Sequence, residues 1–185
     1  MAESIRITTP FTEKISRKLR AGDSVLITGT IISARDAAHK AMTEALAKGE
    51  SLPVDWHDQI VYYLGPTPAK PGDPIGSCGP TTSGRMDAYT PTMLAQGIKG
   101  MVGKGSRSPE VVEAMKKNGV TYFAAVGGAA ALIAKSVKKY EVVGYPELGP
   151  EAVAKLTVED FPCIVVIDSE GNDFYEIGQK PYRRL

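Results

Sequence analysis

The chain has 185 residues, 43% of them hydrophobic, which suits one folded domain over residues 1–185 with one good core or two small cores sharing a sheet. Its 22 Lys and Arg residues balance 21 Asp and Glu residues, so no overall field would draw it to nucleic acid or to a membrane surface. Any anion that it binds must therefore be recognised locally.

No run approaches the ~20 apolar residues of a spanning helix, and the first residues lack the pattern of a secretion signal. We therefore expect a cytoplasmic protein. Cys78 and Cys163 lie far apart without metal-type spacing, and a reducing compartment would keep them as thiols. Cys163 opens an apolar run and is expected in the core.

Short β-rich runs alternate with segments of helical periodicity, a pattern that predicts an α/β protein. The clearest strand is residues 23–33, which are almost wholly apolar, as in a strand covered on both faces. The other predicted strands lie at residues 59–65, 99–105, 121–128 and 163–168.

Three helices are predicted between these strands. Residues 34–48 place apolar side chains at i, i+3 and i+4, with Ser33 as N-cap and Asp36 completing a capping box. Residues 108–118 form the second helix, in which Ser108 is the N-cap and Gly119 follows the end. The third is expected to begin after the glycines at 127–128 and to run to residue 140.

A loop rich in proline and glycine, residues 65–80, leads into the motif GPTTSGRMDAYTP at 79–91. Gly79 and Pro80 suit the start of a helix, whose free amides favour negative charge. On such a helix Thr81 and Arg85 are four residues apart and share a face. Arginine can hold a carboxylate through two parallel hydrogen bonds. The alternative is a capped helix start that faces solvent.

A second motif, SARDAAHK at 33–40, places Arg35 in the first turn of a helix. The helix dipole disfavours a cation there by about 0.3–1 kcal/mol unless an anion is also present. His39 lies on the same face, and an ordinary histidine pKa suits proton transfer at neutral pH. The alternatives are an ion pair between Arg35 and a nearby acid, and a structural role for His39.

A third stretch, residues 97–108, brackets a short apolar strand with glycines and ends it at Lys104. Such a backbone can approach a ligand closely. The spacing of a nucleotide-binding loop fails, because Ile98 stands where its first glycine would be and Gly105 follows the lysine. The alternative is an ordinary surface lysine.

In this order, the three segments resemble the β subunit of two-subunit iron–sulfur fumarases and L-tartrate dehydratases. That subunit corresponds to the C-terminal domain of single-chain class I fumarases. The resemblance spans nearly the whole chain and rests on residues 29–40, 79–91 and 99–106, with looser matches at 52–66 and 159–174. It implies a swivelling β/β/α domain, a mixed sheet flanked by helices, that closes over a larger partner.

The resemblance also implies a reaction, the reversible hydration of fumarate to L-malate. In it, Arg35 and Arg85 would hold the substrate carboxylates and Lys104 would stabilise negative charge that develops when a proton leaves carbon. The proton acceptor stays open between Thr81, favoured by position, and His39, favoured by its ordinary pKa.

The family's cofactor is a four-iron, four-sulfur cluster, which acts as the Lewis acid for the leaving hydroxide. Such a cluster takes three protein thiolates and this chain has two separated cysteines, so the cluster is expected on an α subunit and no metal ligand is expected here, Cys78 included. The resemblance also suggests an α2β2 assembly, and the surface meant for the partner is a candidate for self-association when the chain is isolated.

Rival interpretations remain at this point. Asp87, which follows Met86, favours fumarate over tartrate, but L-tartrate dehydration stays the alternative reaction. The chain could also be a free-standing dicarboxylate-binding module, or a structural subunit whose arginines only dock the partner.

Overall fold

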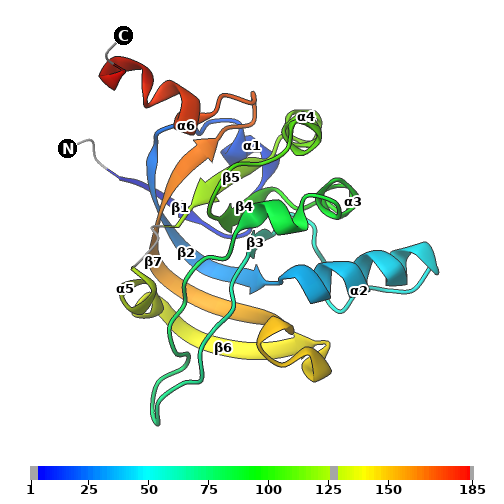
Figure 1. Cartoon of the computed structure of the whole chain (residues 1–185). Coiled ribbons are helices and arrows are strands. Elements are labelled where there is room, and N and C mark those ends of the chain that lie inside the picture. The colour runs from blue at the N-terminus through cyan, green and yellow to red at the C-terminus, as the bar shows by residue number, and fades with distance from the viewer. Residues whose placement is uncertain (1–3, 126–128, 184–185) are drawn as a thin grey trace.

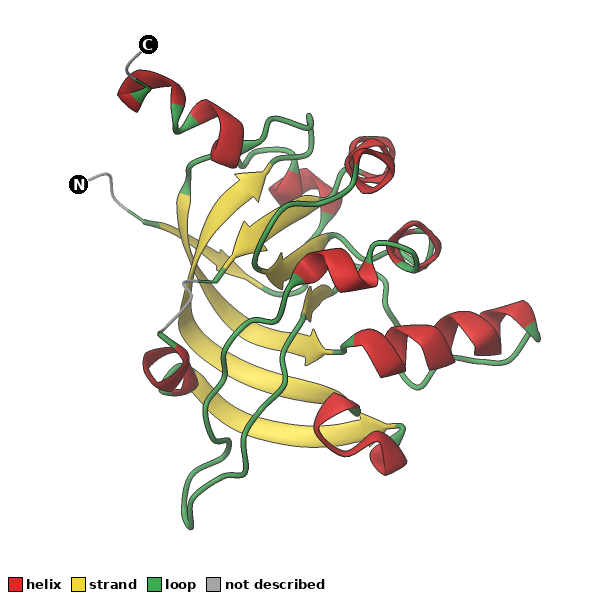
Figure 2. Cartoon of the chain, in the orientation of Figure 1, coloured by secondary structure: helices red, strands yellow, loops and turns green. Residues whose placement is uncertain are grey.

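A computed structural model describes residues 4–125 and 129–183, which form one mixed sheet with helices packed against it (Figures 1 and 2). The strands are β1 (Ile5–Thr8), β2 (Ser24–Ser33), β3 (Ile60–Tyr62), β4 (Gly100–Gly103), β5 (Thr121–Ala124), β6 (Val137–Gly144) and β7 (Val153–Ile167). The α-helices are α1 (Glu13–Ser16), α2 (Asp36–Ala47), α3 (Thr90–Leu94), α4 (Pro109–Asn118), α5 (Ala130–Ala134) and α6 (Phe174–Ile177), and short 3-10 helices are η1 (Ser83–Met86), η2 (Pro146–Glu151) and η3 (Lys180–Tyr182).

The longest strand, β7, organises the sheet. Strands β1 to β5 are parallel to their neighbours, whereas β7 runs antiparallel to β2, β5 and β6. One edge of β7 pairs with β2, and the other edge pairs first with β6 and then with β5. The pairings β2–β3–β4–β5–β7–β2 therefore close a circuit, from which β1 and β6 extend as outer strands.

Two hydrophobic clusters lie on opposite faces of the sheet because side chains alternate along each strand. Tyr62 and Phe123 belong to one cluster, whereas their neighbours Val61 and Tyr122 on the same two strands belong to the other. Helices α2, α3 and α4 cover the second cluster with Met42, Met93, Leu94, Val111 and Met115. The expectation of two small cores that share a sheet is met in this form.

The predicted strands are confirmed within the described residues, where β5 ends at Ala124; residues 126–128 of the predicted strand 121–128 lie outside them. The last predicted strand is too short, and two other strands were missed. β7 begins ten residues before Cys163, and β1 and β6 were not predicted. The predicted third helix is wrong beyond α5, which ends at Ala134, because residues 137–144 pair with β7 instead. The predicted start of that helix, after the glycines at 127–128, agrees with α5, whose N-cap is Ala129; the two glycines themselves lie outside the described residues.

The two predicted helix caps had different outcomes. Ser108 caps α4 through a hydrogen bond from Val111 N, and Gly119 ends the helix with a left-handed backbone. The cap at Ser33 is wrong, because Ser33 still belongs to β2 and Arg35 takes the N-cap position without a side-chain bond. The carboxylate of Glu151 instead accepts a hydrogen bond from Ala37 N at 3.0 Å.

No helix within the described residues has the length and apolar character needed to span a bilayer.

Removing the cap of α4 should cost stability. We expect Ser108→Ala to lower the free energy of unfolding by about 1 kcal/mol, because one helix amide loses its acceptor. Ser106→Ala, an exposed serine two residues earlier, is the control and should change stability by less than about 0.5 kcal/mol. Urea unfolding of both variants measures the difference, and equal stabilities would contradict this role of Ser108.

Candidate functional site

The three predicted motifs meet where parallel strands β2, β3 and β4 end. Arg35 follows β2 by two residues, Tyr63 follows β3 directly, and Lys104 follows β4 directly. Parallel neighbours present their carboxyl ends at the same edge of a sheet, which is where ligands bind in many α/β folds. The chain reaches this edge a fourth time through the motif at 79–91 (Figure 1).

The start of the 79–91 motif is extended rather than helical. Pro80 forms an antiparallel bridge with Leu64, Thr81 N donates to Tyr63 O at 2.8 Å, and Thr82 forms a parallel bridge with Lys104. These backbone contacts hold residues 80–82, just before η1, beside the residues that follow β3 and β4. The predicted helix start at Gly79 and Pro80 is therefore wrong, and Thr81 and Arg85 do not share a helix face.

Two of the predicted arginines lie on either side of one carboxylate. Asp36 Oδ1 is 3.9 Å from Arg35 Nε, and Asp36 Oδ2 is 3.8 Å from Arg85 Nη1. Arg35 Nη2 is also 3.4 Å from Glu151 Oε1. These separations exceed ordinary hydrogen-bond lengths, so both guanidinium groups keep donors for another acceptor. Both alternatives for Arg35 thus have support, since it has acidic neighbours and retains free donors.

The surroundings of Arg35 leave it little freedom. Its side chain is 19% exposed, and its Nε and Asp36 Oδ1 are buried without a hydrogen-bond partner in the described parts of the chain. A Cβ added at Gly65 would collide with Arg35 Nη1, so the loop start packs directly on the guanidinium. Arg85, in contrast, is 56% exposed on its side chain.

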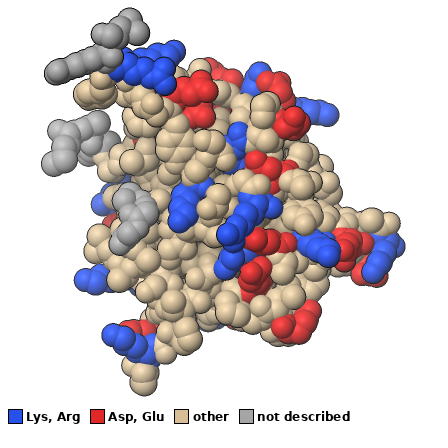
Figure 3. All heavy atoms as spheres, viewed as in Figure 1, with Lys and Arg blue, Asp and Glu red and all other residues tan. Residues whose placement is uncertain are grey.

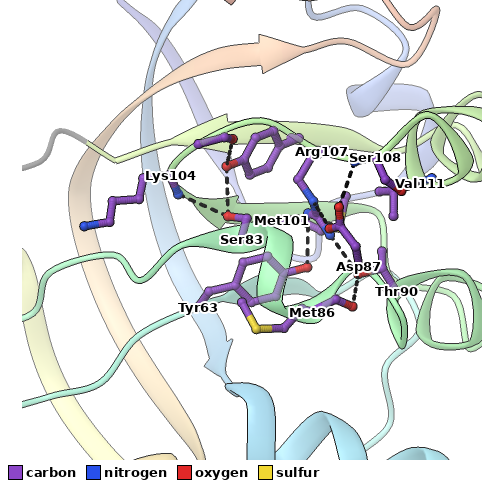
Figure 4. A network of polar contacts seen from close by, with 12 residues as sticks. Tyr63, Ser83, Met86, Asp87, Thr90, Met101, Lys104, Arg107, Ser108 and Val111 are labelled. Carbon is purple, nitrogen blue, oxygen red and sulfur yellow. Dashed lines mark hydrogen bonds and ion pairs between the residues drawn. The ribbon is translucent and has the colours of Figure 1, made fainter.

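Lys104 lies on the other side of the 79–91 motif. Its backbone is held by Ser83, which donates its N–H to Lys104 O at 2.9 Å and accepts from Lys104 N at 3.1 Å. The side chain is exposed and forms no ion pair with the described acidic residues. Figure 4 shows it pointing away from the network behind it.

His39 is buried beneath these groups. Its Nδ1 lies 2.9 Å from Arg35 O, and its ring meets the Tyr63 ring edge-on at 5.5 Å. Burial lowers the pKa of His39 to about 4; Arg107 also lowers it, while the bond to Arg35 O and the charge of Asp36 oppose the shift. The ring is thus neutral at neutral pH, and Nδ1 carries the hydrogen because a carbonyl can only accept.

A buried polar network, which the sequence analysis missed, lies behind the site (Figure 4). The Arg107 side chain is fully buried; its Nε donates to Asp87 Oδ1 at 2.7 Å and its Nη2 to Thr90 Oγ1 at 2.7 Å. The guanidinium lies 5.3 Å from the Tyr63 ring centre and 5.2 Å from that of Tyr122. Its position just before the N-cap of α4 could have marked it, since a cation is disfavoured there for the same reason as at Arg35.

The residues of this chain do not fit an iron–sulfur cluster. Cys78 and Cys163 are free, buried thiols within one hydrophobic cluster, and burial raises the pKa of Cys78 to about 12 and also raises the pKa of Cys163. Within residues 4–125 and 129–183, no three His, Cys, Asp or Glu side chains are grouped to hold a metal ion.

Of the five candidate residues, Arg85 and Lys104 are exposed on one face of the molecule, Thr81 and Arg35 are partly buried, and His39 is buried beneath them. Thr81 N bonds Tyr63 O, the Tyr63 ring meets His39, and His39 bonds Arg35 O. Asp36 lies between Arg35 and Arg85, and Lys104 is held by Thr82 and Ser83 of the same motif as Thr81. A groove of about 630 Å³ lies between the 65–80 loop and α5, and another of about 370 Å³ lies between Thr9 and Lys155; the candidate residues line neither. Figure 3 shows Lys and Arg side chains beside acidic ones near the middle of this face.

Comparison with known proteins places the chain in a family. Residues 1–178 match the model of a protein family that is described as the fumarase C-terminus. The chain belongs to this family. Over 152 residues it is 47% identical to the aerobic class I fumarate hydratase of Escherichia coli, a match covering 81% of this chain and 28% of that protein. The match to fumarate hydratase 2 of Leishmania major is 44% over 156 residues, covering 83% of this chain and 28% of that protein.

A relative of similar length comes from Methanocaldococcus jannaschii and is provisionally named L(+)-tartrate dehydratase subunit beta. It is 43% identical over 181 residues, which cover 94% of this chain and 93% of the relative. The fumarate hydratases are much longer, so the chain spans about a quarter of the length of those relatives.

Protonation of His39 should make stability depend on pH. Because its pKa falls from 6.5 to about 4 on folding, the unfolded chain takes up a proton between these values and the folded chain does not. Stability should therefore decrease as pH falls from about 6.5 to about 4, by up to about 1.4 kcal/mol per pH unit.

Urea unfolding at about pH 7 and about pH 5 measures this effect. His39→Gln should remove this part of the pH dependence, whereas His57→Gln, at a side chain that is 71% exposed, should keep it. An unchanged pH dependence in His39→Gln would show that His39 does not carry it.

Proposed function

We propose that this chain is the β-type part of an iron–sulfur hydro-lyase that interconverts fumarate and L-malate. The observation that carries the proposal is the grouping of Arg35, Arg85 and Lys104 on one open face, with donors not taken up by strong ion pairs. Family membership supports the same reaction, because several relatives are named fumarate hydratase. We further propose one swivelling β/β/α domain in a reducing, cytoplasmic setting, which agrees with two free buried thiols.

The charge demand of the reaction matches these side chains. Removing a proton from the carbon beside a carboxylate gives an aci-carboxylate with extra negative charge. In the proposed reaction Arg35 and Arg85 bind the two carboxylates of the substrate, and Lys104 stabilises the charge as it develops. A guanidinium suits the first task because its planar donors match a carboxylate in pairs.

A partner is needed because the proposed site is open on one side and this chain does not fit a cluster. We propose that an α subunit holds the four-iron, four-sulfur cluster and covers this face, in an α2β2 assembly. Excluding water there would strengthen the attraction between the three cations and the substrate. The same face could drive self-association when the chain is alone.

For the proton acceptor we favour Thr81 over His39. His39 is 1% exposed, and its neutral ring contacts Arg35 O and the Tyr63 ring. Thr81 is partly exposed, its N–H donates to Tyr63 O, and the next residue, Thr82, forms a bridge with Lys104. A cation close to the Thr81 hydroxyl would make that hydroxyl more acidic. In this proposal His39 holds the Arg35 backbone in place.

L-Tartrate dehydration is the second candidate reaction. It is favoured by the Methanocaldococcus jannaschii relative, which the chain matches over nearly its whole length. Fumarate stays first because Asp87 follows Met86 in the motif, as in the fumarase type.

The proposal is tested by anaerobic co-expression with a cluster-bearing partner, followed by assays with L-malate and L-tartrate. We expect the wild-type complex to dehydrate L-malate. Arg85→Ala should lower kcat/KM about 10- to 100-fold, since a hydrogen bond to a charged group contributes about 1.5–3 kcal/mol. Arg85→Lys should recover only part of the loss because a lysine cannot form the paired contact.

Lys40→Ala is the matched control, since Lys40 is an exposed cation of α2 that pairs with Glu44. It should leave kcat/KM unchanged. Size-exclusion chromatography separates catalysis from docking: intact assembly with reduced turnover supports the proposal, and lost assembly supports a docking role for Arg85. A wild-type complex that dehydrates neither acid would refute the assignment.

The proton acceptor is tested in the same complex. Thr81→Val keeps the shape but removes the hydroxyl, and we expect turnover to fall by about 100-fold or more, the usual contribution of a catalytic base. His39→Gln should retain most of the turnover, and its pH profile should keep the wild-type shape. The reverse pattern, a large loss in His39→Gln with a mild effect of Thr81→Val, would assign proton transfer to the histidine.

A further inference from the structure

The following inference rests on the proposed function. We propose that Ser83 and Tyr122 are positioning residues, which fix the Lys104 backbone at the point where it leaves β4 and thereby place the Lys104 side chain. Neither residue would touch the substrate. Both act through the backbone of the loop that follows β4 (Figure 4).

Ser83 makes both backbone contacts of Lys104. Its N–H donates to Lys104 O at 2.9 Å, and its hydroxyl oxygen accepts from Lys104 N at 3.1 Å. The peptide groups on both sides of the Lys104 Cα are thus held by one residue. The long, flexible lysine side chain can reach a defined point only if this Cα is fixed.

The direction of each hydrogen bond follows from its partners. Tyr122 Oη donates to Gly105 O at 2.9 Å, because a carbonyl can only accept. Its one hydrogen is therefore used, and in its 2.8 Å contact with Ser83 Oγ it must accept. Ser83 then donates to Tyr122 and accepts from Lys104 N. The bonds run from Lys104 through Ser83 and Tyr122 to Gly105, and they tie both sides of the loop.

The Ser83 hydroxyl is packed closely against the end of β4. Ser83 and Tyr122 are both fully buried, and a Cβ added at Gly103 would collide with Ser83 Oγ. A side chain at position 103 would thus separate the two segments. Glycine is required there for close approach and not for an unusual backbone angle.

Arg107 and Asp87 hold the same two segments together from behind. Asp87 Oδ2 accepts from Ser108 N at 2.7 Å while Oδ1 binds Arg107. Removing either charge would leave the other unpaired, and an unpaired charge in a buried network is strongly destabilising. Ser83 and Tyr122 can be changed by single atoms, and they are therefore the residues on which positioning can be tested.

The test compares Ser83→Ala and Tyr122→Phe with Ser16→Ala, in the complex with the cluster-bearing partner. Ser16 is a matched control, because it is equally buried and its hydroxyl also contacts a β5 hydroxyl, that of Thr121, at 2.7 Å. We expect kcat to fall about 10- to 100-fold in Ser83→Ala and Tyr122→Phe, with KM changed by less than about threefold, because a displaced Lys104 would stabilise developing charge less well. Ser16→Ala should keep the wild-type kcat.

Hydrogen exchange gives a second readout that does not depend on activity. The Lys104 amide should exchange at least about tenfold faster in Ser83→Ala than in the wild type or Ser16→Ala, since it loses its acceptor. Wild-type kcat in Ser83→Ala, or equal loss in Ser16→Ala, would overturn the proposal even if exchange changes. If the wild-type complex is inactive, the proposed function fails, and unchanged exchange at Lys104 would then overturn the Ser83 contact separately.

Discussion

The buried guanidinium of Arg107 is the constraint on which the rest of the site depends. A charge without access to water is tolerated only when its donors are paired, and here a carboxylate, a hydroxyl and two aromatic faces surround it. These groups come from segments that are distant in sequence. Meeting the needs of one cation therefore brings the 79–91 motif against the loop after β4, and the residues proposed for chemistry lie on the outer side of that junction.

Arg35 and Arg85 are paired more loosely than the buried Arg107. Arg107 has short, direct bonds, whereas Arg35 and Arg85 have acidic neighbours only at 3.4 Å or more. Because these ion pairs are long, exchanging their acidic partner for the carboxylate of an incoming acid should cost little free energy. The chain is nearly neutral overall, so attraction of a small anion depends on this local arrangement rather than on a general field.

The fold was predictable where local patterns decide the structure. The strand at 23–33 and the helix from Pro109 were predicted, because an apolar run and a capped helix carry their signal in adjacent residues. β6 and the first half of β7 were not predicted. The lysine-containing β6 becomes a strand by pairing with β7 at the outer edge of the sheet, and the first half of β7 lies between β6 and β2. Propensity could not reveal that pairing.

The same distinction applies to the site. The residue types of Arg35, Arg85 and Lys104 were visible in the motifs, but their arrangement was predicted from a helix at Gly79 that does not form. That stretch is extended because its backbone pairs with Leu64, Tyr63 and Lys104, contacts that depend on tertiary structure. The burial of His39 was equally hidden, because a helical spacing gives the face of a side chain but not what covers it.

The position of β7 in the chain has a consequence for biosynthesis. This strand alone joins β2 to both β5 and β6, with Ser24 opposite Ile164. A ribosome therefore releases the segments that form β1 to β5 before the strand that closes their sheet exists. Until then the free edges of β2 and β5 are open to other chains, which makes this interval the one in which a chaperone would be most useful.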